Sequence, residues 1–273
     1  MTFINNLLQL LNSEMKRPIP YQSFSESWFH YLSFAFMMIL AIFLSRNLKH
    51  ATDRKLRKYL LVFSIVLLSF EIYKQVIFSY QSGWGYQWYA FPFQFCSTPM
   101  YIALLAALTR NKKLRDSLIA FLGTFGLFAG LAVMLYPMTV FISTVGINIQ
   151  TMVHHGSMVA MGIALLSTQV KLESKTILKA SLVFSILVSI AVILNAIHNT
   201  WIEQGTFNMF FINPILRNDL PILTLIQPLV PHIVFLFIYI LGFMFVSYLV
   251  LLIGILLFKP KVKGLKMIYS KES

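Results

Sequence analysis

The feature of this sequence that most limits its fold is a series of long apolar stretches with almost no charge. Hydrophobic residues make up 58% of the 273 residues and charged residues only 11%, whereas about a quarter of a typical soluble domain is charged. Apolar stretches of about 18 residues or more can cross the ~30 Å hydrocarbon core of a bilayer as helices. We therefore predict an all-α, multi-pass membrane helix bundle. The seven predicted transmembrane helices cover residues 28–45, 60–80, 89–108, 118–135, 149–166, 177–197 and 232–258.

The positions of Lys and Arg predict how the chain is oriented, because basic residues are retained on the cytoplasmic side. The connections after the first, third and fifth spans and the C-terminal segment are rich in these residues, whereas the connections between them hold only Arg217. We therefore predict an N-terminus outside and a C-terminus in the cytoplasm of the cell membrane. We therefore attribute the net charge of +13 to residues that set the membrane topology and not to a surface that binds nucleic acid. We expect one domain over 1–273, with an outer N-terminal segment 1–27 and a basic cytoplasmic tail 259–273.

The longest connection, residues 198–231, lies outside in this topology and carries apolar residues on both sides of Pro214. Long ordered loops are often functional, and so we expect this one to pack on the bundle as a lid over an outward-facing cavity. Residues 4–11 are apolar but too short to span, so we expect them to lie at the interface or to be unstructured. No internal repeat of the inverted-repeat transporter type is evident.

Polar groups inside the predicted spans are costly in lipid and are therefore candidates for function. Helical rise places those of five spans in one layer near the outer surface, which predicts one buried polar site. Each of these residues could instead have a structural role. Glu71 and Lys74 could form an ion pair, Asn195 could bridge two helices by hydrogen bonds, and Cys96 could be a core residue. The candidates for substrate binding are Glu71, Lys74, Gln94, His154, Asn195, His198 and His232 in or beside the spans.

A thiol beside an imidazole suggests nucleophilic catalysis, since the imidazole can take the thiol proton. Cys96 is the single cysteine, so no internal disulfide is expected. His154 and His155 point about 100° apart on a helix, so at most one of them faces a given site squarely. No HExxH spacing is present, and we expect no metal and no cofactor. On the predicted fourth helix, Gly126 and Gly130 form a small-xxx-small pattern that favours close helix packing.

Four short motifs together resemble the YwaF-like family of bacterial integral membrane proteins. They are FPFQFCS at 91–97, a glycine-rich helix ending in Tyr136 and Pro137, HHG at 154–156, and Asn195 followed by GTFNMFFINP at 205–214. The family pattern has a His where this sequence has Gln94. Cys96, His155, Asn208 and Pro214 match it.

The family is similar to an animal group of transmembrane acyltransferases that move fatty acyl chains onto ether phospholipids through a cysteine. The wider superfamily includes membrane hydrolases of fatty-acid esters that use a Thr and a His. The resemblance implies that Cys96 carries the acyl group and that His155 is its base. Glu71 and Lys74 would bind a head group, and Asn208 joins the substrate-binding candidates.

Two functions from different classes follow. The first is a lipid-modifying enzyme, an acyltransferase or lipid-ester hydrolase, that acts on membrane lipids through Cys96 and His155. The second is a transporter or small-molecule-binding component, in which Glu71, Lys74 and the histidines would bind a solute in an outward-facing polar cavity. A receptor-like sensor is a third reading, for which the sequence offers no signalling domain.

Overall fold

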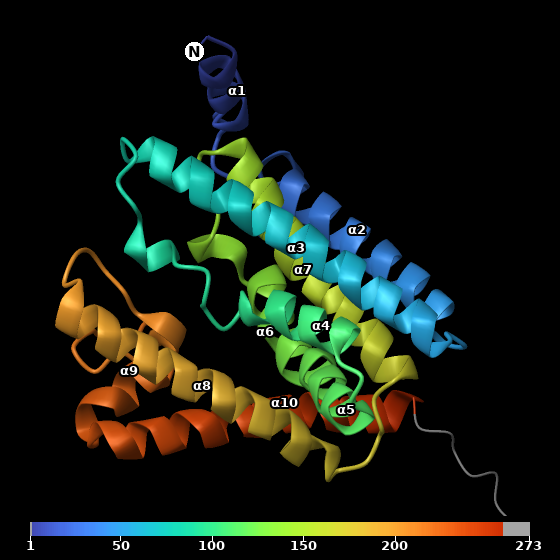
Figure 1. Cartoon of the computed structure of the whole chain (residues 1–273). Coiled ribbons are helices and arrows are strands. Elements are labelled where there is room, and N and C mark those ends of the chain that lie inside the picture. The colour runs from blue at the N-terminus through green and yellow to red at the C-terminus, as the bar shows by residue number, and fades with distance from the viewer. Residues whose placement is uncertain (1, 259–273) are drawn as a thin grey trace, which may run out of the picture.

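The computed structural model describes residues 2–258, and within these residues the fold is all-helical. The predicted basic tail 259–273 lies outside the described residues. Among the described residues, six helices are long and apolar enough to cross a membrane. They are α2 (Phe24–Leu48), α3 (Asp53–Gln81), the continuous helix Lys112–Leu135, α7 (Val145–Thr168), α8 (Thr176–Trp201) and α10 (His232–Phe258) (Figure 1).

The continuous helix Lys112–Leu135 contains α5 (Lys112–Phe121), a π-helical turn η2 (Leu122–Gly126) and α6 (Leu127–Leu135). Single π-helical turns inside α-helices are uncommon and often lie near functional sites. The helix ends at Leu135, and its C-cap Tyr136 lies directly before Pro137. Proline has no backbone N–H to continue the helical bonding.

The predicted third span is only half helical. The short turn η1 (Trp88–Ala90) and the irregular residues 91–97 precede α4 (Thr98–Leu108), which has 11 residues. A helix of that length is about 16 Å long, too short to cross the hydrocarbon core alone. Pro92 and Pro99 explain the break, because proline and the residue before it disfavour a helix interior.

Irregular backbone at membrane depth requires partners for its polar groups. Side chains supply them here: the Tyr101 hydroxyl donates to the carbonyl of Pro92 at 2.9 Å, and the Thr98 hydroxyl donates to that of Phe95 at 2.8 Å. The segment 91–97 is thus a defined structure held inside the bundle.

One end of the bundle carries the connections rich in Lys and Arg. Arg57, in the first turns of α3, donates to the carbonyls of Ala107 and Thr109 at 2.8 and 2.7 Å and so caps the end of α4. Asp53 pairs with both Arg57 and Arg115. The α2–α3 and α4–α5 connections therefore meet at this end.

The opposite end gathers the N-terminal segment, the end of α3 and the start of α7. The side chain of Gln81 donates to Asn12 at 2.7 Å and to Thr144 at 2.9 Å, and the N–H of Met15 donates to Ser143 at 2.7 Å. Residues 82–111 therefore connect opposite ends of the bundle, which Figure 1 also shows.

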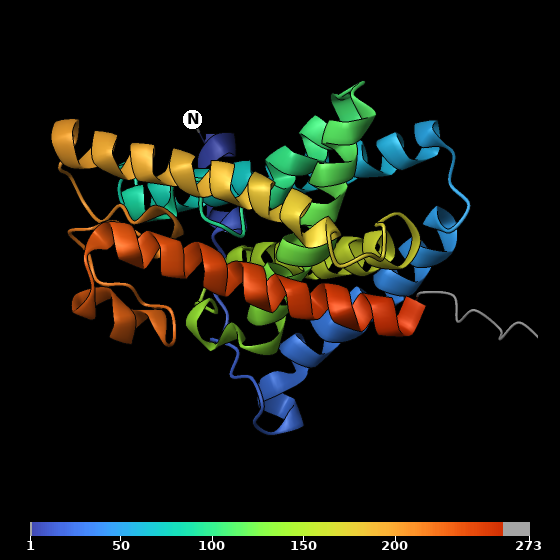
Figure 2. The same ribbon diagram turned by 90° about the horizontal axis from the view of Figure 1, so that it is seen from below.

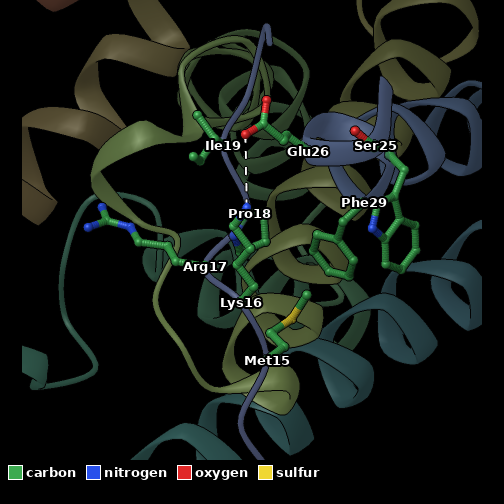
Figure 3. A pocket seen from close by; sticks show the side chains of 9 residues that line it. Met15, Lys16, Arg17, Pro18, Ile19, Ser25, Glu26 and Phe29 are labelled. Atoms are coloured by element: carbon green, nitrogen blue, oxygen red, sulfur yellow. Dashed lines mark ion pairs between the residues drawn. The ribbon is translucent and has the colours of Figure 1, made fainter. Parts of the chain in front are cut away.

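The N-terminal segment is folded against this second end. Its first residues form α1 (Thr2–Leu11), which projects from the bundle in Figure 1. Arg17 then donates to the carbonyl of Met138 at 2.7 Å, in the turn η3 (Pro137–Thr139). Lys16 pairs with Glu26 of α2 at 3.9 Å beside a small pocket (Figure 3). These contacts hold α2 and the α6–α7 connection together.

The central helix is α7, which packs against α2 and α6 and carries a row of buried polar side chains. Gly130 of α6 allows a close approach to the α7 backbone: a Cβ there would lie 2.9 Å from the carbonyl oxygen of His155. Gly126 has ordinary spacing, with its nearest neighbour at 3.7 Å. Of the predicted glycine pair, only Gly130 marks a tight helix contact.

Helices α8 and α10 lie side by side in both views and form one flank of the molecule (Figures 1 and 2). The long connection between them is ordered and contains three short elements. These are η4 (Met209–Phe211), α9 (Leu223–Ile226) and η5 (Gln227–Leu229).

Candidate active site

Cys96 lies in the irregular segment before α4, and its side chain is partly exposed. The break in the helix leaves its backbone carbonyl without a helical partner. His154 of α7 supplies one, with its Nε2 2.9 Å from that oxygen. The contact joins the thiol-bearing segment to the central helix.

The two histidines of α7 carry their hydrogens on different nitrogens. A carbonyl oxygen only accepts, so Nε2 of His154 donates to Cys96 and its Nδ1 keeps a lone pair. Nδ1 of His155 donates to the carbonyl of Thr151 at 2.8 Å, which leaves the lone pair on Nε2. Both lone-pair nitrogens are buried without a hydrogen-bond partner. The two rings are neighbours, with centroids 5.3 Å apart.

On α3, Glu71 and Lys74 form the predicted i,i+3 ion pair. Lys74 Nζ lies 2.8 Å from Glu71 Oε1, and the side chain of Gln75 donates to the same oxygen at 2.8 Å and to the carbonyl of Ala90 at 2.6 Å. The second carboxylate oxygen, Oε2, is buried without a partner. Burial, and secondly the charge of Glu71, raises the pKa of Tyr86 in the connection after α3.

These groups form one cluster, which we call the polar cluster: Glu71, Lys74, Cys96, His154 and His155. Glu71 pairs with Lys74 on α3, which packs against α7 and α4, and His154 of α7 contacts both the Cys96 backbone and the His155 ring. Three separate elements therefore bring together residues that the sequence placed at one depth. Three acceptor atoms without partners lie in this cluster, which is unusual for buried groups.

The other amide candidates are engaged with the long loop. The side chain of Gln94 donates to the carbonyl of Asn208 at 2.9 Å and accepts from the N–H of Phe210 at 3.0 Å. Asn195 makes the same two-way contact with the backbone of Met209, at 3.0 and 2.9 Å. Asn208 in turn accepts from the N–H of Asn213 and donates to the carbonyl of Arg217. These residues hold the loop against the bundle.

Two further asparagines, which are not among the candidates predicted from the sequence, also hold the long loop in place. Asn213 exchanges hydrogen bonds with Asn199 at 2.9 Å, and Asn218 donates to the carbonyl of Phe211 at 2.6 Å. Both are 0% exposed. The available signal was the spacing of Asn208, Asn213 and Asn218, five residues apart in an otherwise apolar loop.

His198 and His232 make their contacts with residues outside the polar cluster. The ring of His198 stacks on Phe207 at 4.4 Å and its Nε2 donates to the carbonyl of Gln204. The ring of His232 lies 6.3 Å from that of Phe235 on its own helix. That both join Cys96 in one site therefore stays a prediction, because their contacts are with neighbouring rings and, for His198, with the backbone of Gln204.

A cavity of about 500 Å³ adjoins Cys96. Its wall is almost wholly apolar and comes from α6, α10, the long loop and the segment before α4. The glutamate, lysine and histidines of the polar cluster are not among the described residues that line it. The predicted polar cavity is thus two features, an apolar cavity and a buried polar cluster, with Cys96 in both. The lining residues are Gln94, Phe95, Cys96, Phe128, Ala129, Ala132, Val133, Phe211, Leu220, Pro221, Ile222, Leu223, Tyr239, Gly242, Phe243 and Val246.

Across residues 2–258, no group of three or more His, Cys, Asp or Glu side chains is arranged to hold a metal ion. As possible metal ligands, the polar cluster offers one carboxylate on α3 and two imidazoles with free lone pairs on α7.

The fold and the site define a multi-pass helical membrane protein with a cysteine between a buried polar cluster and an apolar cavity. Residues 23–248 match the model of the TMEM164 family, and this chain belongs to that family of transmembrane proteins. No curated protein and no solved structure matches the chain. The resemblance to the YwaF-like family stays an interpretation of the motifs.

Proposed function

We propose that this protein is a membrane-embedded enzyme that transfers an acyl group to or from a phospholipid or fatty-acid ester through Cys96. One observation carries the proposal: the only cysteine lines a large apolar cavity while its backbone is bonded to the polar cluster. An acyl chain suits the cavity, and the ester at its end requires polar groups.

The proposed reaction has two steps. The sulfur of Cys96 attacks the ester carbonyl, its proton passes to a histidine, and the C–O bond breaks with return of that proton to the leaving alcohol. The acyl group is then a thioester on Cys96. A second hydroxyl, from another lipid or from water, attacks the thioester and restores the thiol.

His155 is the proposed base. A catalytic base needs a free lone pair and a partner that orients its ring, and both histidines have these. We assign the base to His155 because the ring of His154 is already bonded to the backbone of Cys96. His154 is a positioning residue, since it holds the carbonyl of Cys96. Lys74 and Glu71 are proposed to bind the polar head of the lipid.

The competing function, transport or binding of a small polar solute, finds less support. A polar solute would need polar groups along its cavity, and the wall observed here is apolar apart from Gln94 and the phenol of Tyr239.

We also propose that the chain crosses the membrane seven times, with its N-terminus outside. The support is that residues 82–111 link opposite ends of the bundle, so that α4 and the irregular segment before it complete a crossing. The end rich in Lys and Arg would face the cytoplasm.

The test of the proposed reaction is the intact mass of the protein in phospholipid nanodiscs. Wild type is expected to gain the mass of a fatty acyl group, and Cys96→Ser is expected not to. His155→Gln should slow adduct formation, because the thiol loses its base. The matched variant His154→Gln keeps a donor for the carbonyl of Cys96 and should form the adduct faster than His155→Gln.

An unmodified wild-type protein whose cysteine also resists a thiol alkylator near neutral pH would refute the proposal. Cys96 would then be a core residue.

A further inference from the structure

The apolar cavity is bounded by two candidate membrane-spanning segments, α6 and α10. Four of the lining residues are exposed: Pro221 and Ile222 of the long loop, and Ala132 of α6 and Gly242 of α10. Ala132 and Gly242 are small, and a Cβ added at Gly242 would meet no atom within 4 Å. The space between α6 and α10 at these two residues is open.

The surface around Gly242 is lipid-facing in character. Its neighbour Leu241 is 61% exposed, and Phe237 and Phe245 on the same helix are exposed to a similar extent. In a spanning helix such side chains contact hydrocarbon. An opening between α6 and α10 at this position therefore faces the interior of the bilayer and not water.

The far side of the cavity is closed by aromatic rings that lead toward the cysteine. Phe243 of α10 contacts Phe128 of α6 at 6.0 Å between ring centroids, Phe95 at 5.2 Å and Tyr239 at 4.6 Å. Phe95 is the residue before Cys96. A chain inserted past Gly242 and Ala132 would run along these rings.

The long loop supplies the remaining wall through Phe211 and Leu220–Leu223. Phe211 and Ile222 have φ of 57° and 69°, in the left-handed region that bulky and β-branched residues rarely adopt. Such conformations persist only where surrounding contacts hold them. For Phe211, the hydrogen bonds of Asn195, Gln94 and Asn218 to residues 209–211 provide those contacts.

We propose that the gap between Ala132 and Gly242 is a lateral entrance, through which one acyl chain of a bilayer lipid slides into the cavity at Cys96. We expect an acyl chain as the occupant, because the cavity has an apolar wall and opens into the hydrocarbon core of the bilayer. The inference deepens the proposed function, but chain binding itself requires no chemistry at Cys96.

The experiment uses the full chain carrying Cys96→Ser, in nanodiscs of phosphatidylcholine with a small share of a phosphatidylcholine that has a diazirine at the end of one acyl chain. Illumination attaches the probe to nearby residues, which peptide mass spectrometry identifies. Adducts are expected on Phe128, Phe243 and Val246 in the cavity, as well as on Phe237 on the outer face.

Gly242→Phe and, independently, Ala132→Phe are expected to plug the entrance. Either should lower the cavity adducts about tenfold if the plug excludes two methylene groups, and leave the Phe237 adduct unchanged. The matched control Leu241→Phe adds an aromatic ring beside the entrance but outside the cavity, and should leave all adducts as they are. Thermal melting establishes that each variant is folded.

Cavity adducts that persist in both plugged variants, or that are absent without a plug, overturn the entrance. Because Cys96→Ser cannot form a thioester, the result is separate from the proposed reaction. Cavity adducts without acylation of wild type would support the lateral entrance and refute the proposed acyl-transfer reaction. Acylation of wild type without cavity adducts would support the reaction and refute the entrance.

Discussion

At the scale of single residues, His154 and His155 show how neighbours on one helix take different roles. His154 satisfies a carbonyl that the broken third span leaves free, whereas His155 bonds to Thr151 within its own helix. The 100° between them predicted that only one could face a given site. Which one reaches Cys96 depends on where residues 91–97 lie, and that is a property of the packing.

His154→Ala is expected to destabilise the protein more than His155→Ala. The first leaves the buried carbonyl of Cys96 without its donor, at a cost of about 1–3 kcal/mol. The second removes a ring of the same size from the same helix, and the carbonyl of Thr151 can still be bonded within α7. Thermal melting in detergent measures the difference. Equal losses would mean that the contact with Cys96 contributes little.

Gly130→Ala is expected to lower stability by roughly 1–3 kcal/mol, because the new methyl group would lie 2.9 Å from the carbonyl oxygen of His155. Gly126→Ala, on the same helix, meets its nearest neighbour at 3.7 Å and is the matched control. It should melt at or slightly above the wild-type temperature. A similar loss in both would show that the α6–α7 contact tolerates an extra methyl group at Gly130.

At the scale of elements, amide side chains hold the long loop in place by forming hydrogen bonds with its backbone N–H and carbonyl groups. Asn195 and Gln94 each offer one donor and one acceptor to the loop backbone, near Met209 and Phe210. Residues that polarity alone suggested for substrate binding therefore have a structural task. Their positions in helix and segment determine where the cavity wall stands.

Asn195→Ala is expected to loosen this loop. It leaves the N–H of Met209 unpaired in a buried place and its carbonyl with only the N–H of Ile212, at roughly 1–3 kcal/mol. Limited proteolysis between residues 202 and 231 should become faster, and the melting temperature should fall. Asn47→Ala removes an amide that donates to Phe43 in its own helix and accepts from Lys55 of α3 at 3.5 Å, away from the loop, and should leave proteolysis of the loop unchanged. A protected loop in Asn195→Ala would contradict the proposed fastening.

At the scale of the whole molecule, the connections sort into two ends. Arg57 and Asp53 organise the basic end, and Gln81 joins the N-terminal segment to the start of α7 at the other. Some of the basic residues that predict topology thus have a second task, as Arg57 does at the end of α4.

The proposed orientation predicts opposite labelling of two single-cysteine variants made in the Cys96→Ser background. Ser82 and Ser174 are both exposed and lie in the connections after α3 and α7. A membrane-impermeant maleimide applied to intact cells should label Ser82→Cys and spare Ser174→Cys until the membrane is opened. The reverse pattern would invert the topology, and labelling of both would contradict the crossing by residues 82–111.

The sequence by itself determined the class of protein, the place of six long helices and the set of residues from which the polar cluster is drawn. These follow from local properties, since hydropathy, helix length and the positions of Lys and Arg can be read along the chain. The break in the third span was not predicted, since hydropathy alone gave one helix over 89–108. Only the tertiary structure decided that His154 contacts Cys96, that Asn195 and Gln94 hold the loop, and that the cavity is apolar and lies between α6 and α10. Each depends on side chains from distant segments meeting in space, which no periodicity within one segment records.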